Sequence, residues 1–312
     1  MSESAVSAPQ SKQSFSLWQR VSGWVVNPWG RPRFLVLITW AYMVWAIVPV
    51  IIAVQFSFND GRSRTVWQGF STQWYWSNPD SIWNNAELRD ALVHSLTLAA
   101  WDVLIAVPLG VTLALGLARW RSRGSGGANF LMLFPLVTPE IVMGVSLLLL
   151  FTQLPPFTHI HTGGLAQVLG HVTFSISYVV VIVRGRMFSI GREYEEAAAD
   201  LGASPGVALW KVLLPLLMPA IVASAAIVFA ISIDDFVISQ WLSSGPSTTT
   251  VPMEIYDATR AAPTPATNAI ATVMVIVTLT SVVAGFLVWR AFTRGQHGAK
   301  QSTMRDFAAF DV

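Results

Sequence analysis

The sequence predicts an all-α polytopic membrane protein with six transmembrane helices, and both its composition and its hydropathy pattern support this. Of the 312 residues, 53% are hydrophobic and 12% are charged, and the mean hydropathy is +0.54. Average soluble domains carry about 25% charged residues, so this composition favours a chain that lies mostly in a bilayer. Six separate apolar segments, each of roughly the 20 residues that cross a hydrocarbon core, give the number of helices.

The predicted spans form a six-helix domain over residues 34–292, between tails at 1–33 and 293–312. The third span contains Pro139, which can break a helix and free backbone carbonyls. The fourth is the least apolar and includes His171. The spans are Phe34–Phe56, Ser95–Leu117, Phe130–Phe151, Leu165–Val183, Leu216–Trp241 and Ala269–Trp289.

The positive charges predict an orientation, because Lys and Arg are retained on the cytoplasmic side. With the N-terminus inside, 15 of the 19 Lys and Arg residues fall in inner segments. The outer segments hold only Arg62, Arg64, Arg89 and Arg260. We therefore expect both termini, and the loop 184–215 between spans four and five, to be cytoplasmic.

Several kinds of site are excluded by what the sequence lacks. Without cysteine, the chain has no disulfide and no thiolate metal site. It contains no G-x-x-x-x-G-K-[ST] phosphate loop, so it does not hydrolyse ATP by that route. No basic run with interleaved aromatic residues indicates a nucleic-acid partner. We predict no catalytic residues, no metal and no cofactor, with ATP bound by a partner chain.

The loop YEEAAADLGASPGVALWKVLLP, Tyr194–Pro215, is unusually polar for this chain. Residues from Glu193 to Leu201 are good helix formers, and Gly202 is placed to end that helix in a left-handed cap. Ser204 and Pro205 then have the residue types of an N-cap and a first-turn proline. A second helix, 206–214, would present an apolar face to the membrane domain, before Pro215 begins the fifth span. The apolar face consists of Val207, Trp210, Leu213 and Leu214.

The spacing in this loop resembles the EAA motif of permease subunits of ABC importers. Glu196-Ala197-Ala198, three residues, Gly202, nine residues and then Val212-Leu213-Leu214-Pro215 match that motif, with Val212 in place of Ile. We call Tyr194–Pro215 the EAA loop. The resemblance implies the type I importer permease fold and a loop that docks on a separate ATPase. The implied coupling residues are Glu196, Ala197, Ala198, Asp200, Leu201, Gly202, Ala203, Ser204 and Pro215.

Four acidic residues lie in predicted spans: Asp102, Glu140, Asp234 and Asp235. Ionisable side chains at membrane depth are costly and point to function, and no Lys or Arg lies within a predicted span. A path lined only by carboxylates suits a cationic passenger. For Asp102, a local hydrogen bond to His94, Ser95 or Thr97 is an equally good interpretation.

Beyond the loop, residues 34–292 look like the spermidine/putrescine class of these permeases. The matching stretches include "TPEIVMGVSLLLLF" at Thr138–Phe151, "SIDD" at Ser232–Asp235 and "WQGFSTQWY" at Trp67–Tyr75. By this resemblance the substrate path includes Trp67, Glu140, Ser232, Asp234 and Asp235. The tryptophans of the first outer loop are open to several interpretations: an interfacial aromatic belt or a small packed cap, a cation–π contact with polyamine, or a docking surface for the binding protein.

The resemblance implies a multi-pass protein of the bacterial plasma (inner) membrane, in contact with lipid. Its partners would be a dimer of ATP-binding subunits, a second and similar permease, and an extracellular or periplasmic substrate-binding protein. The alternative solutes on the same fold are ferric iron, since carboxylates bind hard cations, and an oxyanion. A proton-coupled secondary transporter leaves the EAA loop unexplained. An intramembrane aspartyl protease needs its two aspartates on separate helices, whereas Asp234 and Asp235 are adjacent.

Overall fold

Helices make up every regular element of the described chain, in which the only β-type pairing is a single bridge between Asn59 and Phe70. The computed structural model describes residues 33–63, 65–120, 124–154, 157–260 and 264–308. Most of the predicted N-terminal tail and the arginines Arg64, Arg121 and Arg123 lie outside these ranges. The all-α prediction is confirmed.

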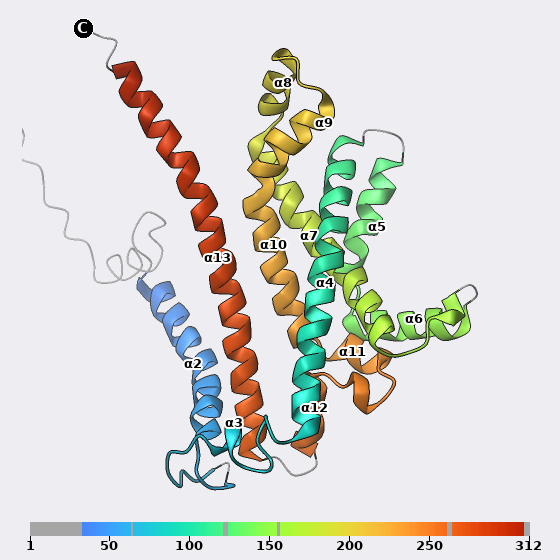
Figure 1. Ribbon diagram of the computed structural model, residues 1–312, viewed down its shortest axis with the longest axis vertical. Helices are drawn as coiled ribbons and strands as arrows, with labels where there is room; N and C mark the ends of the chain where they lie inside the picture. Colours follow the sequence, from blue (N-terminus) through green and yellow to red (C-terminus); the bar gives the residue numbers. More distant parts are fainter. Residues whose placement is uncertain (1–32, 64, 121–123, 155–156, 261–263, 309–312) are drawn as a thin grey trace, which may run out of the picture. The chain divides into compact units, whose positions relative to one another are not determined.

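Five of the described helices are long and apolar enough to cross a membrane. Four of these crossings are the helices α2 (Arg33–Ser57), α4 (Ala86–Arg119), α7 (Gly164–Ile190) and α13 (Pro265–Ala308) (Figure 1). The fifth crossing, 205–234, ends in α10 (Leu214–Asp234). The helices α5 (Ser125–Val137) and α6 (Glu140–Gln153) also have a spanning composition if they are taken together, which brings the number of crossings to six.

The predicted third span is not one helix, because α5 and α6 meet at an angle of 109°. Thr138 is extended, with ψ 129°, and a residue before proline is pushed toward that conformation. Pro139 itself is extended and precedes the first turn of α6. The predicted middle of a span at Glu140 is therefore the start of a new helix.

The predicted fifth span is broken as well, at its other end. The helix α10 stops at Asp234, Asp235 is extended with ψ 125°, and the short helix α11 (Val237–Leu242) follows in a new direction. The predicted span appeared continuous because apolar residues lie on both sides of the break. The acidic pair Asp234 and Asp235 marks the position of the break.

The chain divides into two compact units, Met1–Ala53 and Val54–Val312. Most of α2 belongs to the first unit and is an uninterrupted apolar helix that includes Pro49. The features below all lie in the second unit.

The core of the second unit is built by α4, α7, α10 and α13, with α10 packed against the other three. Hydrogen-bonded pairs fix the directions of these helices. His94 pairs with Gln167 and Asp102 with Ser175, so α4 and α7 run parallel. Two parallel crossings require a crossing between them in the opposite direction, which is the role of the bent pair α5 and α6.

The two broken segments pack on each other, since α11 lies against α6 and α7. A methyl group added at Gly170 of α7 would come within 2.6 Å of the Leu242 side chain and 2.8 Å of Ile238. Glycine is therefore what allows α11 to approach α7 so closely.

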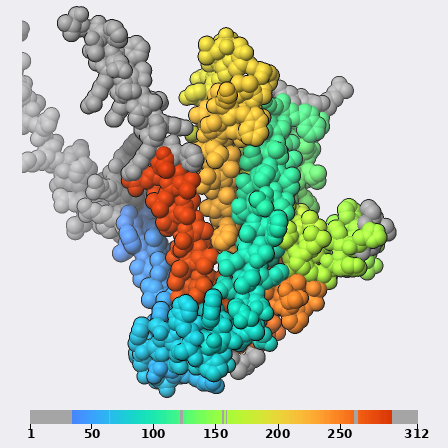
Figure 2. Space-filling view, viewed as in Figure 1, coloured from blue at the N-terminus to red at the C-terminus, as the bar shows by residue number. Residues whose placement is uncertain are grey.

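The segment 58–85 forms a packed cap at the end of α13 opposite the EAA loop (Figure 2). Its short helix α3 (Gln73–Trp76) buries Trp74, which donates from Nε1 to the Asn59 carbonyl at 2.7 Å. The Asn59 amide in turn bonds the backbone of Ser63, Val66 and Gln68. These contacts favour the packed-cap interpretation for part of the aromatic loop.

The remaining short elements connect these parts. They are η1 (Phe157–His159), α8 (Glu193–Asp200), α9 (Pro205–Ala208), the π-helical turn η2 (Leu209–Leu213), η3 (Pro246–Thr248) and α12 (Val251–Arg260).

Candidate functional site: the EAA loop and two acid-bearing helix breaks

The first half of the EAA loop ends in a Schellman motif. Gly202 has φ +80°, as predicted, and its N–H bonds the Ala199 carbonyl at 2.8 Å. The Ala203 N–H reaches back to the Ala198 carbonyl at 3.0 Å. The chain therefore leaves α8 in a sharp turn whose geometry depends on a left-handed residue at position 202.

The second half differs from the prediction. Ser204 occupies the position before Pro205, but its side chain makes no cap bond. The helix then continues through the turn η2 into α10, so that residues 205–234 form one helix and Pro215 does not interrupt it. Proline is tolerated in a first helical turn, and here the π turn precedes it.

The predicted apolar face of this second half is buried only in part: Leu213 and Leu214 pack on the core, and the other two residues do not. Ala208 and Leu213 are buried, whereas Val207 and Trp210 are exposed, Trp210 by 72%. At the tip, Leu201 is 90% exposed. Exposed large apolar side chains are typical of protein–protein contacts.

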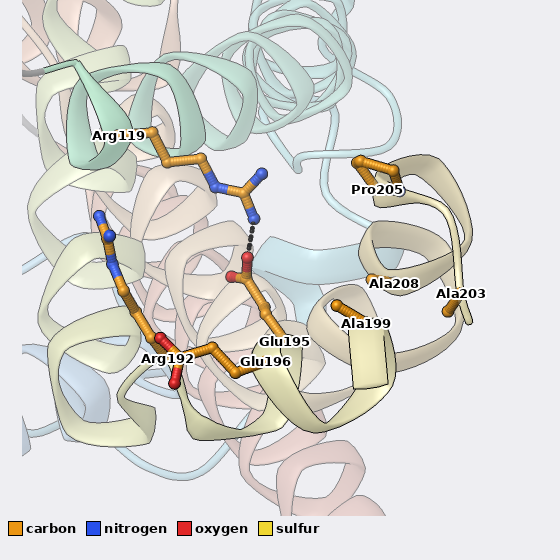
Figure 3. A pocket seen from close by; sticks show the side chains of 8 residues that line it. All are labelled: Arg119, Arg192, Glu195, Glu196, Ala199, Ala203, Pro205 and Ala208. Atoms are coloured by element: carbon orange, nitrogen blue, oxygen red, sulfur yellow. Dashed lines mark hydrogen bonds and ion pairs between the residues drawn. The ribbon is translucent and has the colours of Figure 1, made fainter. Parts of the chain in front are cut away.

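An ion pair ties the EAA loop to a neighbouring crossing. Arg119, the last residue of α4, contacts the Glu195 carboxylate on α8. Both side chains line a hollow of about 470 Å³ together with residues from both halves of the loop (Figure 3). The other lining residues are Arg192, Glu196, Ala199, Ala203, Pro205 and Ala208. The loop therefore contacts α4 through this ion pair, in addition to its connections along the chain to α7 and α10.

Two of the predicted path residues are exposed, one at each helix break. Glu140 is the first residue of α6 and Asp234 the last of α10. The breaks that carry them lie near one another, because α11, which follows α10, packs against α6. No Lys or Arg of the described chain forms an ion pair with Glu140 or Asp234. The two helix breaks therefore bring together unneutralised negative charge.

Asp235 and Ser232 have a different environment from Asp234. Ser232 is buried and lies 2.7 Å from His171 Nδ1. Asp235 is 10% exposed, and its Oδ2 accepts from the Ser239 N–H at 2.9 Å and lies 3.2 Å from His171 Nε2. Ser232 and Asp235 are therefore part of one hydrogen-bonded network with His171.

Asp102 is fully buried, and its partner is not one of the predicted local ones. Ser175 of α7 donates to Asp102 Oδ2 at 2.7 Å, while Oδ1 makes no hydrogen bond to any described residue. Of the three local candidates, Ser95 instead accepts from the Val251 N–H and His94 bonds Gln167.

Trp67 is placed apart from the acids. Its ring lies edge-on to Phe56 in the segment that leads into the cap, with centroids 6.4 Å apart, and 42% of the residue is exposed. The structure brings Glu140, Asp234, Asp235 and Ser232 together and leaves Trp67 elsewhere.

The polar side of α7 was not predicted. Gln167, His171 and Ser175 follow one another at intervals of four residues, and all three are buried. That spacing places them on one helix face. A polar stripe at helical spacing inside a predicted span would have identified them.

The chain matches a known protein family. Residues 106–296, more than half of the chain, match the family described as "binding-protein-dependent transport system inner membrane component". The chain belongs to this family. It is therefore a permease subunit of an ABC importer and not a catalytic enzyme, and it is a multi-pass inner-membrane protein. Its family implies an ATPase and a substrate-binding protein as partners.

Several curated permeases are similar over most of their length. The spermidine/putrescine transport system permease protein PotC of Escherichia coli K12 is 36% identical over 83% of this chain and 94% of its own. The putrescine permease PotI of the same organism is 37% identical over 87% and 93%. PotC of Haemophilus influenzae is 36% identical over 83% and 98%.

A solved structure supports the fold. A chain of the bacterial alginate ABC transporter, in complex with its periplasmic protein, superposes with a TM-score of 0.65. It is 15% identical, and the match covers 86% of this permease and 95% of that chain.

Proposed function

We propose that this permease forms one half of the path of an ATP-driven importer of polyamines, of the spermidine and putrescine type. The observation that carries the proposal is the pair of exposed carboxylates, Glu140 and Asp234, held at two helix breaks without a cationic partner in the described chain. The similarity to PotC and PotI supports the same substrate class.

The chemistry of the breaks suits a flexible polycation. A linear polyamine carries separate ammonium groups, which can exchange water for one carboxylate after another. Opposite unit charges about 4 Å apart attract by about 4 kcal/mol at the effective dielectric constant of a protein surface. That strength holds a passenger in the path yet allows release, as conduction requires.

The EAA loop supplies the coupling in this proposal. Its exposed tip, with Leu201, Asp200 and Glu196, would dock on the ATP-binding subunit. Because the loop runs directly into α10, a displacement of its tip would reach the break that carries Asp234. We further propose that a second, similar permease completes the path and that the loop lies on the cytoplasmic side.

Uptake of labelled spermidine and putrescine tests the proposal. Glu140→Gln and Asp234→Asn keep the side-chain shape and remove the charge. Each should lower uptake at least about tenfold, because losing only a third of that attraction, about 1.4 kcal/mol, corresponds to this factor. Asp90→Asn is the matched control, because Asp90 is an exposed acid at the start of α4. Expression and co-purification with the ATPase should stay unchanged.

Two outcomes would contradict the proposal. Wild-type uptake in both variants and in their double variant would mean that these acids do not contact the passenger. Competition by ferric iron or by an oxyanion, with none by unlabelled polyamine, would replace the substrate class while leaving the permease assignment intact.

A further inference from the structure

The break between α10 and α11 is held by a histidine from another helix. His171 of α7 is 2% exposed. Its Nδ1 lies 2.7 Å from Ser232 Oγ, in the last turn of α10. Its Nε2 lies 3.0 Å from Ser239 Oγ, in α11, and 3.2 Å from Asp235 Oδ2. One imidazole ring therefore bonds the chain on both sides of the break.

The short helix α11 depends on such contacts. It has six residues, and isolated helices shorter than about 12 residues are marginal in water. Its first turn is capped by the Asp235 carboxylate, which accepts from the Ser239 N–H and from Ser239 Oγ. An ionised carboxylate accepts hydrogen bonds and donates none. A proton on His171 Nε2 therefore gives the Asp235 carboxylate a further donor.

The two acids at this break differ in their surroundings. In an unbroken helix, successive side chains diverge by about 100°, and both acids would turn with α10. Here Asp235 is held in the α11 cap by His171 and Ser239, and Asp234 remains exposed. We propose that His171 is a positioning residue for transport: by joining Ser232 to Asp235 and Ser239, it fixes the break that leaves Asp234 in the substrate path.

The role of His171 in transport rests on the proposed function. Its role in positioning Asp234 can be tested without any substrate. The chain contains no cysteine, so a single Asp234→Cys substitution provides one thiol at the break. Its rate of reaction with a charged, water-soluble maleimide reports the exposure of position 234. The measurement uses the full importer in membranes, at matched expression.

Three further substitutions are compared in this Asp234→Cys background. His171→Leu removes the bonds to both sides and should change the labelling rate at least about fivefold, since each lost buried bond shifts such an equilibrium by roughly that factor. His171→Gln keeps a donor and an acceptor and should restore most of the rate. His94→Leu is the control: His94 bonds Gln167 in the same α4–α7 interface and makes no bond to Asp235. Equal labelling rates in His171→Leu and in the parent would overturn the proposal.

Uptake provides the second test, in chains that retain Asp234. If His171 acts through Asp235, then adding His171→Leu to Asp235→Asn should lower uptake less than about twofold further, because coupled residues are not additive. A fully multiplicative loss would overturn the proposal. Where His171→Leu does not accumulate, Ser232→Ala removes only the bond on the α10 side and should give an intermediate labelling rate. A labelling rate unchanged by Ser232→Ala would then contradict the proposal.

The two proposals fail in different ways. If the importer takes up no polyamine but labelling still responds to His171→Leu and recovers in His171→Gln, the substrate class is wrong and the positioning role stands. If polyamine uptake is normal in His171→Leu and labelling is unchanged, the positioning role is wrong and the substrate class stands.

Discussion

Asp234 and Asp235 are neighbours in sequence but differ in environment, and the difference arises from a residue 64 positions away from Asp235. Asp234 is exposed, while Asp235 receives donors from Ser239 and His171. A buried charge-assisted bond is worth about 1.5–3 kcal/mol, which is enough to decide the direction of a short helix. Two aspartates that are adjacent in sequence therefore have different roles here, and the residue type alone does not predict which of them lines a path and which closes a helix break.

Glu254 in α12 provides a separate test, because this helix is not one of the membrane-spanning segments. Burial raises the pKa of Glu254 above its ordinary value, and the charges of Glu87 and Asp257 raise it further. A carboxyl group with a raised pKa binds its proton more tightly in the folded state, so stability falls as the pH rises from the ordinary pKa through the raised one.

We therefore expect Glu254→Gln to raise the midpoint of thermal unfolding at alkaline pH and to change it little at acidic pH, where the native carboxyl is protonated. The effect is measured by thermal unfolding of the detergent-solubilised importer at a series of pH values from acidic to alkaline. Asp90→Asn, at an exposed acid paired with Arg89, is the control. A lower midpoint for Glu254→Gln at alkaline pH would contradict the assignment.

At the scale of the helices, the sequence located the crossings well and their interruptions only in part. Runs of apolar residues gave all six crossings, and Pro139 marked the bend between α5 and α6 by its effect on Thr138. The break after Asp234 was not predicted, because apolar residues continue on both sides of it. It depends on His171, which comes from a distant helix, and hydropathy along one segment carries no information about such a contact.

The EAA loop was predicted in detail where its geometry is local. The positive φ of Gly202 follows from the residue type that a Schellman motif requires. The continuation of α9 into α10 through a π turn, and the exposure of Trp210, depend on packing against the rest of the molecule. These features were missed for that reason.

A β-branched residue at position 202 should uncouple ATP hydrolysis from uptake. No described atom lies within 4 Å of a Cβ built on Gly202, so Gly202→Val acts only through the backbone, at a cost of roughly 1–2 kcal/mol for a left-handed residue. Gly202→Asn should retain coupling, since Asn tolerates this conformation. Gly206→Ala is the control, with equal space and no positive φ. The ratio of ATP hydrolysed to substrate taken up is the measurement; a normal ratio in Gly202→Val would refute the prediction.

The ion pair between Arg119 and Glu195 should contribute to coupling rather than to stability. Both side chains are partly exposed, by 43% and 26%, and such pairs are worth about 0.2–1 kcal/mol. Arg119→Glu should raise the ratio of ATP hydrolysed to substrate taken up, at unchanged expression, because it places two acids side by side. The double variant Arg119→Glu/Glu195→Arg should restore it. A double variant that remains as impaired as Arg119→Glu would show that the contact does not transmit force.

At the scale of the whole permease unit, the directions of the crossings are linked to one another. The helices α4 and α7 are parallel, and α10 is antiparallel to α7, since His171 pairs with Ser232 and Arg186 with the Leu216 carbonyl. The contact from Arg119 to Glu195 places the end of α4 beside the EAA loop. Reporters fused after Arg123 and after Arg192 must therefore lie on the same side of the membrane, whichever way the protein is inserted.

The excess of Lys and Arg predicts that this side is the cytoplasm. We expect fusions after Arg123 and Arg192 to give a cytoplasmic signal, and fusions within Gly61–Asn84 and Ser247–Thr264 to give an external one. Paired reporters, one active only inside and one only outside, check each position independently. Opposite signals after Arg123 and Arg192 would contradict the arrangement of six crossings. External signals at both would instead reverse the orientation, and since ATP is a cytoplasmic substrate, the EAA loop would then be on the wrong side to reach its ATPase.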